Sequence, residues 1–205
     1  MKILIATTNS GKAKEFREML GGDAYQWLNL KDIANVPEVE ETGLTFAENA
    51  AIKAAAYAKS ANCWALADDS GLMVDAIGQK PGVHSARWAQ LHSAGQGDAD
   101  NNMLLLRQLA DVPDNKRSAR FCCELALSDP SGNIICTARG TVEGSVLRSP
   151  RGQNGFGYDP LFLILSLGKT TAELSSDEKH AISHRGNALR RLKRLLEEFQ
   201  ILRPD

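Results

Sequence analysis

Cysteine is scarce in this chain, and its spacing is not that of a disulfide framework or a zinc ribbon. Cys63, Cys122, Cys123 and Cys136 contain no C-x-x-C pair, and side chains of two adjacent strand residues such as Cys122 and Cys123 point to opposite faces. The simplest interpretation is a protein with reduced thiols in a cytoplasmic setting.

An excess of charge of either sign is also missing. The chain carries 24 Lys and Arg residues against 25 Asp and Glu residues, for a formal net charge of -1. Such a balance gives no global positive field that would hold nucleic acid, so no nucleic-acid partner is expected. The last predicted helix has basic residues that we interpret as a solvated face: Arg190, Arg191, Lys193 and Arg194.

Long apolar runs are absent as well. Residues 1–6 form too short an apolar segment for a signal peptide, and polar residues follow at once. No stretch approaches the length that a membrane span requires, so no membrane partner is expected.

The composition is that of a globular α/β protein. Hydrophobic residues make up 43% of the 205 residues, which is enough for a substantial core, and we expect residues 1–205 to form a single domain. The first unit is predicted to be a strand at residues 2–6 and a helix that carries Phe16, Met19 and Leu20 and ends near Gly21.

Two further signals predict the rest of the architecture. Thr45 with Glu48 forms a capping box that opens an alanine-rich helix, which can pack closely against a sheet. Residues 119–127 and 133–140 are predicted strands joined by a turn at residues 129–132. The fold class is therefore α/β, with parallel-type units and an antiparallel hairpin.

The segment Ala67-Asp68-Asp69-Ser70-Gly71 is the most informative part of the chain. The apolar run before it predicts a buried strand, and the segment is expected to be the tight turn where that strand ends. Two adjacent carboxylates repel each other unless a cation favours both ionised forms, so the pair is suited to a divalent metal such as magnesium. Alternatively, Asp68 caps a helix or shapes the turn.

The loop from Thr7 to Lys12 has the chemistry of a polyphosphate site. It offers hydroxyl groups, an amide, one lysine and the backbone N–H groups of a helix start. It is not a Walker A loop, because Ala6 and Ala13 stand where that motif requires a glycine and a Ser or Thr. An ordinary surface turn remains the alternative.

Charged residues elsewhere could join these groups. Glu40 and Glu41 precede the helix that begins after Thr45, and they can approach Asp68 and Asp69 if the two connections meet at one sheet edge. They could equally be solvated loop charges. A basic element at Lys179, His184 and Arg185 follows a second capping box, and His184 to Gly186 are expected to interrupt the helical pattern.

Six short motifs occur in order along nearly the whole chain: T-x-N-x-G-K, E-E-T-G-x-T-F-x-E-N-A-x-x-K-A, A-D-D-S-G-L, P-G-x-x-S-A-R, G-F-G-Y-D-P and S-H-R-G. Together they resemble the inosine triphosphate pyrophosphatase family, the XTP/dITP diphosphatases that cleanse nucleotide pools. The resemblance implies an elongated mixed central sheet flanked by helices, two lobes with a cleft between them, and a homodimer. It also implies Mg2+-dependent hydrolysis of ITP, dITP and XTP to the monophosphate and pyrophosphate.

The resemblance also assigns residues by position. The triphosphate would be held by Thr7, Thr8, Asn9, Ser10, Gly11 and Lys12, with Lys53 on phosphate. Glu40 and Asp69 would hold the metal, with Asp69 also the base and with Asp68 and Lys53 as the other catalytic residues. Which of Glu40, Glu41 and Asp68 contacts the metal directly stays open. The rest of the nucleotide site would be Ser70, Phe156, Gly157, Tyr158, Asp159, Lys179, His184 and Arg185.

The sequence supports a mechanistic hypothesis. Water attacks the α-phosphorus in line, Asp69 orients or deprotonates it, and Lys12 and Lys53 with magnesium neutralise the departing pyrophosphate. Phe156 is predicted to stack on the base, and His184, Arg185 or nearby amides to read the 6-oxo group that distinguishes inosine and xanthosine from adenosine. Phe156 could instead be an ordinary core residue.

Two other functions stay open at this stage. One is a magnesium-dependent phosphatase that forms an aspartyl-phosphate on Asp68 or Asp69 and releases orthophosphate. The other is a nucleotide-binding module without turnover. The sequence departs from the family pattern at Thr8, where a glycine is common, and at His84 and Trp88, where tyrosines are frequent.

Overall fold

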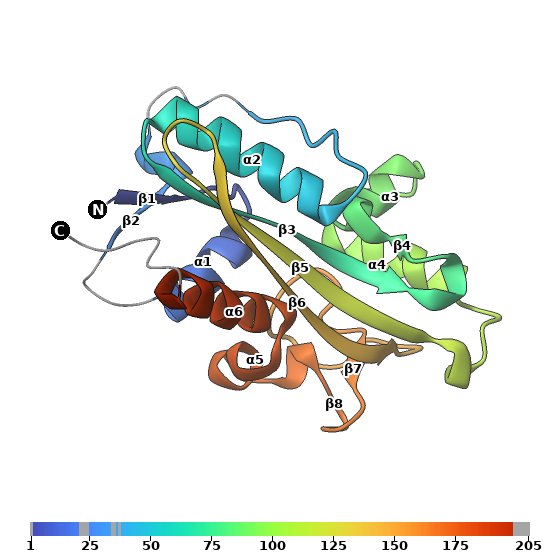
Figure 1. Ribbon diagram of the computed structural model, residues 1–205. Helices are drawn as coiled ribbons and strands as arrows, with labels where there is room; N and C mark the ends of the chain where they lie inside the picture. The colour runs from blue at the N-terminus through green and yellow to red at the C-terminus, as the bar shows by residue number, and fades with distance from the viewer. Residues whose placement is uncertain (1, 21–24, 34–35, 37, 199–205) are drawn as a thin grey trace. The chain divides into compact units, whose positions relative to one another are not determined.

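The computed structural model describes the chain except for residues 1, 21–24, 34–35, 37 and 199–205 (Figure 1). The chain divides into two compact units, each built from several segments. Unit 1 comprises Met1–Asp69, Cys123–Gly140 and Arg185–Asp205, and unit 2 comprises Ser70–Cys122 and Thr141–His184.

The secondary structure is that of an α/β protein, as the sequence predicts. The strands are β1 (Lys2–Ile5), β2 (Gln26–Asn29), β3 (Trp64–Val74), β4 (Lys80–Pro81), β5 (Ser118–Ser128), β6 (Ile134–Val146), β7 (Phe162–Ile164) and β8 (Lys169–Thr170). The helices are α1 (Ser10–Leu20), α2 (Phe46–Ala61), α3 (Trp88–Leu91), α4 (Gly97–Gln108), α5 (Ser176–Ile182) and α6 (His184–Glu198).

The strands form a mixed sheet in the order β2-β1-β3-β5-β6-β7-β8, with β4 paired to β3. β1 runs parallel to both β2 and β3, whereas β4 is antiparallel to β3 and β7 is antiparallel to β6 and β8. The predicted combination of parallel units with antiparallel strands is therefore confirmed.

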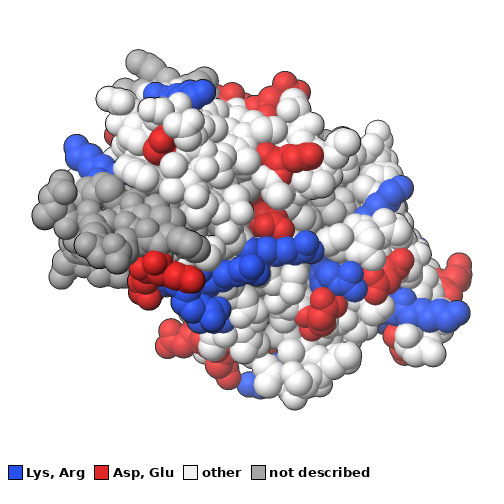
Figure 2. Space-filling model, viewed as in Figure 1, with Lys and Arg blue, Asp and Glu red and all other residues white. Residues whose placement is uncertain are grey.

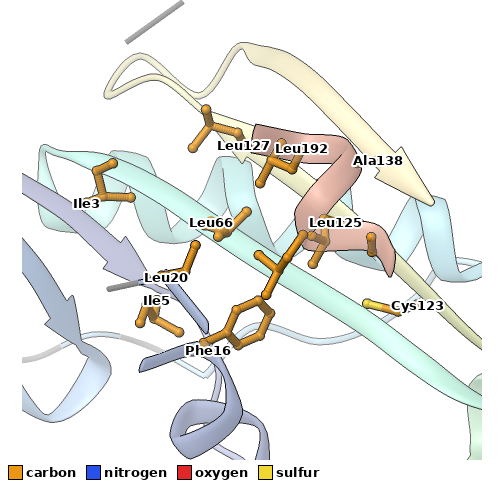
Figure 3. Close-up of a cluster of buried hydrophobic side chains, with 12 residues drawn as sticks. Ile3, Ile5, Phe16, Leu20, Leu66, Cys123, Leu125, Leu127, Ala138 and Leu192 are labelled. Atoms are coloured by element: carbon orange, nitrogen blue, oxygen red, sulfur yellow. The ribbon is translucent and has the colours of Figure 1, made fainter. Parts of the chain in front are cut away.

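Unit 1 has a layer of helix on each face of its strands. Because side chains alternate along a strand, Ile3 and Ile5 pack with α1 and α6, whereas Leu4 and Ala6 pack with α2. Figure 3 shows the first of these clusters, in which Phe16 lies beside Ile5 and apolar side chains of β3, β5 and α6 complete the core.

Helix α2 can pack closely along the part of its buried face that carries alanine side chains. Ala50, Ala54 and Ala58 recur every four residues on that face and are at most 1% exposed. The predicted capping box is present, since the Thr45 side chain accepts from the Glu48 N–H and the Glu48 carboxylate accepts from the Thr45 N–H. The absence of bulk lets the helix backbone approach the strands beneath it.

Unit 2 has its own apolar core. Leu105 of α4 and Leu109, which follows the helix, pack with Leu161 and Phe162. The ring of Phe162 lies 4.6 Å, centroid to centroid, from the ring of Phe121. No helix in the described part of the chain is long and apolar enough to cross a membrane.

Two local predictions are wrong. The strand does not end in a turn after Asp69, because β3 continues through Gly71 to Val74. Gly71 makes this possible, since a Cβ there would collide with the Ser85 hydroxyl and the Gly82 carbonyl. His184 to Gly186 do not interrupt a helix either: α6 begins at His184, and the break falls at Ser183, whose ψ is 158°.

The hairpin prediction is confirmed by β5 and β6, which are joined through hydrogen bonds from Gly132 N to Asp129 O and from Asp129 N to Asn133 O. The predicted end of α1 near Gly21 lies outside the described residues. Basic side chains gather over α6 with acidic ones beside them (Figure 2), and Arg190, Arg191, Lys193 and Arg194 are exposed.

Candidate active site

Alternation along β3 sends the two adjacent aspartates to opposite faces of the sheet. Leu66 belongs to the cluster with α1 and α6, whereas Ala65 and Ala67 belong to the cluster with α2. Asp68 therefore faces α1 and α6, and Asp69 faces α2. The two carboxylates were expected to lie side by side, but each lies in its own environment.

Asp68 lies in a buried network of charges. It is 1% exposed, and its Oδ2 is 3.0 Å from Lys12 Nζ and 3.4 Å from Arg185 Nη2. Arg185 also forms an ion pair with Glu15 of α1 and lies over the ring of Phe16. The four charges alternate in sign, so the network is neutral as a whole.

The network fixes the charge states of its members. Burial would raise the pKa of Asp68, but Lys12 and Arg185 outweigh it and hold that pKa well below its ordinary value. For Arg185, burial would lower the pKa, and the carboxylates of Asp68 and Glu15 raise it above the ordinary value instead. Asp68 is thus a permanent counter-ion for Lys12 and Arg185 at neutral pH.

Asp69 lies against two residues of one face of α2. Its Oδ2 is 3.2 Å from Asn49 Nδ2, and its Oδ1 is 3.5 Å from Lys53 Nζ. Asn49 and Lys53 are four residues apart, which places them one turn from each other on the helix. Each oxygen of the Asp69 carboxylate therefore has its own donor.

Lys53 connects Asp69 to the segment before α2. Its ammonium is 2.6 Å from Glu41 Oε1. Burial would lower the pKa of Lys53, but Asp69, Asp68 and Glu41 outweigh it and raise that pKa, so the lysine stays charged. Burial raises the pKa of Asp69, which makes its carboxylate a better proton acceptor near neutral pH.

The segment before α2 is tied to the first turns of the helix. Glu48 Oε2 accepts from Leu44 N at 2.7 Å, and Asn49 Oδ1 accepts from Gly43 N at 2.7 Å. These bonds fix the chain between Glu41 and Thr45. Glu40 is exposed, and Glu41 is partly buried against Lys53.

Few carboxylates are available to a metal ion at one point. Among the residues that the structure describes, no three His, Cys, Asp or Glu side chains are grouped so as to hold one. Glu41 and Asp69 are two carboxylates that both contact Lys53. Hard oxygen donors of this kind suit magnesium, which takes one or two carboxylates with water and phosphate oxygens.

The loop from Thr7 to Lys12 leads from β1 into α1. β1 and β3 are parallel up to the pair Ile5 and Leu66, so this loop and Asp68 both follow the same stretch of parallel pairing. Asn9 Oδ1 accepts from Lys12 N at 3.0 Å, which caps the helix start. The first N–H groups of a helix have no partner within it and attract anions.

In unit 2 the loop of residues 155–159 is held by Asp159. Its Oδ2 is 2.9 Å from Phe156 N and 2.6 Å from Lys179 Nζ, and its Oδ1 accepts from Thr171 Oγ1 at 2.8 Å. The ammonium of Lys179 also lies 4.9 Å from the centre of the Phe156 ring. Asp159 and Lys179 thus fix the position of a half-buried aromatic ring.

Two other predicted site residues are part of the packing of unit 2. Tyr158 is 3% exposed and donates its hydroxyl to Ser85 O at 3.0 Å, and burial raises its pKa. His184 is 6% exposed and stacks on Phe121 at 4.8 Å between centroids. Ser70, the first residue of unit 2, is partly exposed.

The structure also presents polar contacts that the sequence analysis did not assign. Gly157 is held at both backbone groups by α4: its N–H donates to Asp98 at 2.6 Å, and its carbonyl accepts from Asn102 at 2.9 Å. Asn49 and Glu15 were missed as well. Asn49 lies within a motif and four residues before Lys53, which is the one signal that could have identified it.

The predicted site residues therefore fall into two clusters. Unit 1 holds the loop from Thr7 to Lys12 with Asp68 and Arg185 on one face of its strands, and Glu41 and Lys53 with Asp69 on the other; unit 2 holds Phe156 to Asp159 with Lys179. The fold and these clusters define a class: a mixed α/β protein that brings carboxylates, lysines and a helix N-terminus together beside parallel strands.

The family follows from comparison of the whole chain with known proteins. Residues 3–195 match the model of the Ham1 family, and the chain belongs to that family. The resemblance seen in the motifs is thereby confirmed.

Curated relatives match over nearly their full length. The dITP/XTP pyrophosphatase of Exiguobacterium sibiricum is 53% identical over 202 residues, which cover 97% of this chain and 98% of the relative. The dITP/XTP pyrophosphatase of Bacillus subtilis is 47% identical over 194 residues, which cover 95% of this chain and 96% of the relative.

Solved structures agree with the fold. A HAM1 protein from Coxiella burnetii has a TM-score of 0.85 at 42% identity, with 97% of this chain and 99% of the other covered. A dITP/XTP pyrophosphatase from Mycobacterium abscessus has a TM-score of 0.74 at 45% identity, with 94% and 97% covered. The predicted α/β fold with a mixed sheet flanked by helices is confirmed.

Proposed function

We propose that this protein hydrolyses the non-standard purine nucleoside triphosphates dITP, XTP and ITP to the monophosphate and pyrophosphate, and so cleanses the nucleotide pool. The single observation that carries the proposal is the match to dITP/XTP pyrophosphatases that are 53% and 47% identical in sequence over nearly the whole chain. The pairing of Asp69 with Lys53 in unit 1 supports the reaction chemically.

The cofactor that we propose is Mg2+, held by Asp69 together with Glu40 or Glu41. The cluster of Glu41 and Asp69 around Lys53 supports this ligand set. When bound, the metal supplies positive charge at the phosphate oxygens and lowers the cost of ionising the water nucleophile. One or two carboxylates leave room for phosphate oxygens among its ligands.

The triphosphate is proposed to bind at Thr7, Thr8, Asn9, Ser10, Gly11 and Lys12, together with Lys53. The helix start at Ser10 and the ammonium of Lys12, which is held by Asp68, support this part of the site. Because Asp68 is buried and ion-paired, its proposed contribution to catalysis is to hold Lys12 at a fixed position for the phosphates.

In the proposed reaction, a water oxygen forms a bond to the α-phosphorus while the bond from that phosphorus to the bridging oxygen breaks. Asp69 accepts a proton from the water, and the electron pair of the broken bond leaves on pyrophosphate. Lys12 and Lys53 neutralise charge on the leaving group. A base whose pKa is raised by burial, as that of Asp69 is, serves this role better than an ordinary surface aspartate.

Recognition of the nucleobase is proposed for the second cluster. Phe156 stacks on the base, and the cation Lys179 beside its ring strengthens the stack. Ser70, Gly157, Tyr158, Asp159 and His184 complete this part of the site, Tyr158 and Asp159 by supporting the loop. The buried contacts of Arg185 with Asp68 and Glu15 favour a supporting role over direct reading of the 6-oxo group.

The experiment that tests the function is a substrate panel with Mg2+, in which both pyrophosphate and orthophosphate are measured. We expect pyrophosphate from dITP, XTP and ITP and far slower turnover of ATP, whose 6-amino edge mismatches a site built for a 6-oxo group. Orthophosphate as the first product would favour the aspartyl-phosphate phosphatase, and binding without either product would favour the non-catalytic module.

A variant ties the reaction to Asp69. Asp69→Asn keeps the shape of the side chain and removes the proton acceptor, so kcat for dITP should fall on the order of 10²–10⁴-fold. Circular dichroism and thermal unfolding serve as controls for the fold. Turnover near the parental rate would contradict the assignment of Asp69 as the base.

The motif resemblance also supports a homodimer, and the cysteine spacing, which is not that of a disulfide framework, supports a cytoplasmic setting. We propose both, and light scattering at several protein concentrations tests the homodimer directly. A monomer at micromolar concentration would contradict the proposal.

A further inference from the structure

Asn49 is a fully buried polar residue in the first turns of α2, and its exposed fraction is 0%. Its carboxamide makes two hydrogen bonds in opposite senses. The Nδ2 group donates to Asp69 Oδ2 at 3.2 Å, and Oδ1 accepts from Gly43 N at 2.7 Å. The side chain thus bridges the proposed base and the segment that carries Glu41.

We infer that Asn49 is a positioning residue for the reaction, one that fixes the orientation of the Asp69 carboxylate. The inference rests on the proposed function, because it requires Asp69 to act on the attacking water. Asn49 itself acts through Asp69.

The contacts of Asp69 give the physical reason. With Oδ2 bound by Asn49 and Oδ1 near Lys53, rotation of the carboxylate would break both contacts at once. A base must be held within hydrogen-bond reach of its proton, and a displacement of about 1 Å can cost ~10²-fold in rate. Removing the amide leaves Lys53 as the dominant attraction and lets the carboxylate turn toward it.

The second bond links this orientation to the preceding segment. Gly43 is packed so closely that a Cβ would lie 2.7 Å from Asn49 Oδ1 and 2.6 Å from Glu48 Cβ. A glycine is therefore required for the Gly43 N–H to reach Asn49. Through this bond one carboxamide fixes both Asp69 and the backbone two residues after Glu41.

Two substitutions separate the two bonds. Asn49→Leu has nearly the same shape and removes both of them. Asn49→Asp keeps an acceptor for Gly43 but replaces the donor to Asp69 with a second carboxylate, which repels it. If orientation of Asp69 is the main effect, both variants should lower kcat for dITP, whereas loss of the loop contact alone would affect only Asn49→Leu.

The expected result is a fall in kcat of about 10–10²-fold with a KM for dITP that stays within about twofold of the parental value. A merely structural role would change the amount of folded enzyme and leave kcat per folded molecule unchanged. Rates are therefore measured well below the unfolding temperature and divided by the active fraction from pre-steady-state titration.

Asn101 is a matched control in unit 2. It is 1% exposed, its Oδ1 accepts from Ala89 N at 2.7 Å, and its Nδ2 donates to Ala86 O at 3.1 Å. Asn101→Leu therefore removes the same kind of buried amide from another helix. We expect it to lower the unfolding temperature while kcat per folded molecule stays within about twofold of the parental value.

A double-mutant cycle gives the decisive readout. If Asn49 acts through Asp69, Asn49→Leu in the Asp69→Asn background should reduce single-turnover rates by less than about twofold beyond Asp69→Asn alone. An equal loss in both backgrounds, or a change in KM with kcat intact, would overturn the positioning role. A parental protein that releases no pyrophosphate from dITP would instead refute the proposed function, and an Asp69→Asn variant with near-parental turnover would refute the assignment of Asp69 as the base.

Discussion

At the scale of single residues, the separation of Asp68 from Asp69 is the most consequential feature of the site. The two side chains are adjacent in sequence, yet one is a counter-ion for Lys12 and Arg185 and the other lies against Asn49 and Lys53. Their pKa values are shifted in opposite directions, downward for Asp68 and upward for Asp69. Such a division of roles suits a pair in which one group holds charge and the other takes a proton.

The buried ion pairs of Asp68 make a prediction about stability. Asp68→Asn leaves Lys12 and Arg185 without this counter-charge, so the free energy of unfolding at pH 7 should fall by about 3–5 kcal/mol. Because the pKa of Asp68 is lowered by folding, the parental protein loses this stabilisation as the pH falls below the ordinary aspartate value of about 3.9. The difference between the two proteins should therefore shrink in acid.

Urea denaturation of both proteins at pH 7, 4 and 3 measures this difference. Arg190→Gln, on the exposed face of α6, is the control and should change the free energy of unfolding by less than about 0.5 kcal/mol. A difference between parent and Asp68→Asn that stayed constant with pH would contradict the ionised state of Asp68.

At the scale of elements, α4 holds the loop that carries Phe156. Asp98 and Asn102 lie four residues apart on α4 and bind the N–H and the carbonyl of Gly157. The helix is itself anchored in the core of unit 2 through Leu105. A loop fixed at the residue next to the proposed stacking ring leaves that ring little freedom to move.

The contact between α4 and the loop predicts a split in the kinetic parameters. Asn102→Ala removes one bond to Gly157, so Phe156 should be held less firmly and KM for dITP should rise about 3–10-fold, equivalent to roughly 1 kcal/mol for one hydrogen bond. Because the cluster around Asp69 is untouched, kcat should stay within about twofold.

Steady-state kinetics with dITP checks this split, and Met103→Ala, at an exposed neighbouring position of α4, serves as its control. A fall in kcat at unchanged KM would show that Asn102 does not act through base binding.

Much of the secondary structure could be predicted from the sequence. The capping box at Thr45 and Glu48 identifies the start of α2, and alternating apolar residues identify β5 and β6. The continuation of β3 beyond Asp69 could not be predicted from the sequence, because a D-D-S-G segment has the composition of a turn. Gly71 lies in the continuing strand, and Ser85 and Gly82 approach it closely. That approach is a tertiary contact, which the local sequence does not reveal.

At the scale of the whole molecule, the small number of carboxylates in the proposed metal site predicts that Mg2+ binds tightly only together with the nucleotide. The proposed ligand set is Asp69 with one glutamate, and magnesium bound there would complete its shell with water and phosphate oxygens. We expect Mg2+ alone at millimolar concentration to shift the unfolding temperature by less than about 1 °C. Mg2+ with a non-hydrolysable dITP analogue should raise it by several degrees, as ligand linkage requires.

Differential scanning fluorimetry with Mg2+, the analogue, both, or EDTA measures these shifts. Activity should vanish in EDTA and return on addition of Mg2+. A large stabilisation by Mg2+ in the absence of nucleotide would reveal a complete metal site that the proposed ligands do not provide.

The sequence by itself determined the fold class, the family and most of the charged residues near the site, because composition, hydrophobic period and local motifs are properties of the chain alone. Only the tertiary structure decided which face each aspartate occupies and which side chains hold it. Whether Asn49 meets Asp69, or Arg185 meets Glu15, depends on packing between segments far apart in sequence. Local patterns do not predict such contacts, because each polar side chain could find its hydrogen-bond partners in water until the fold excludes that water.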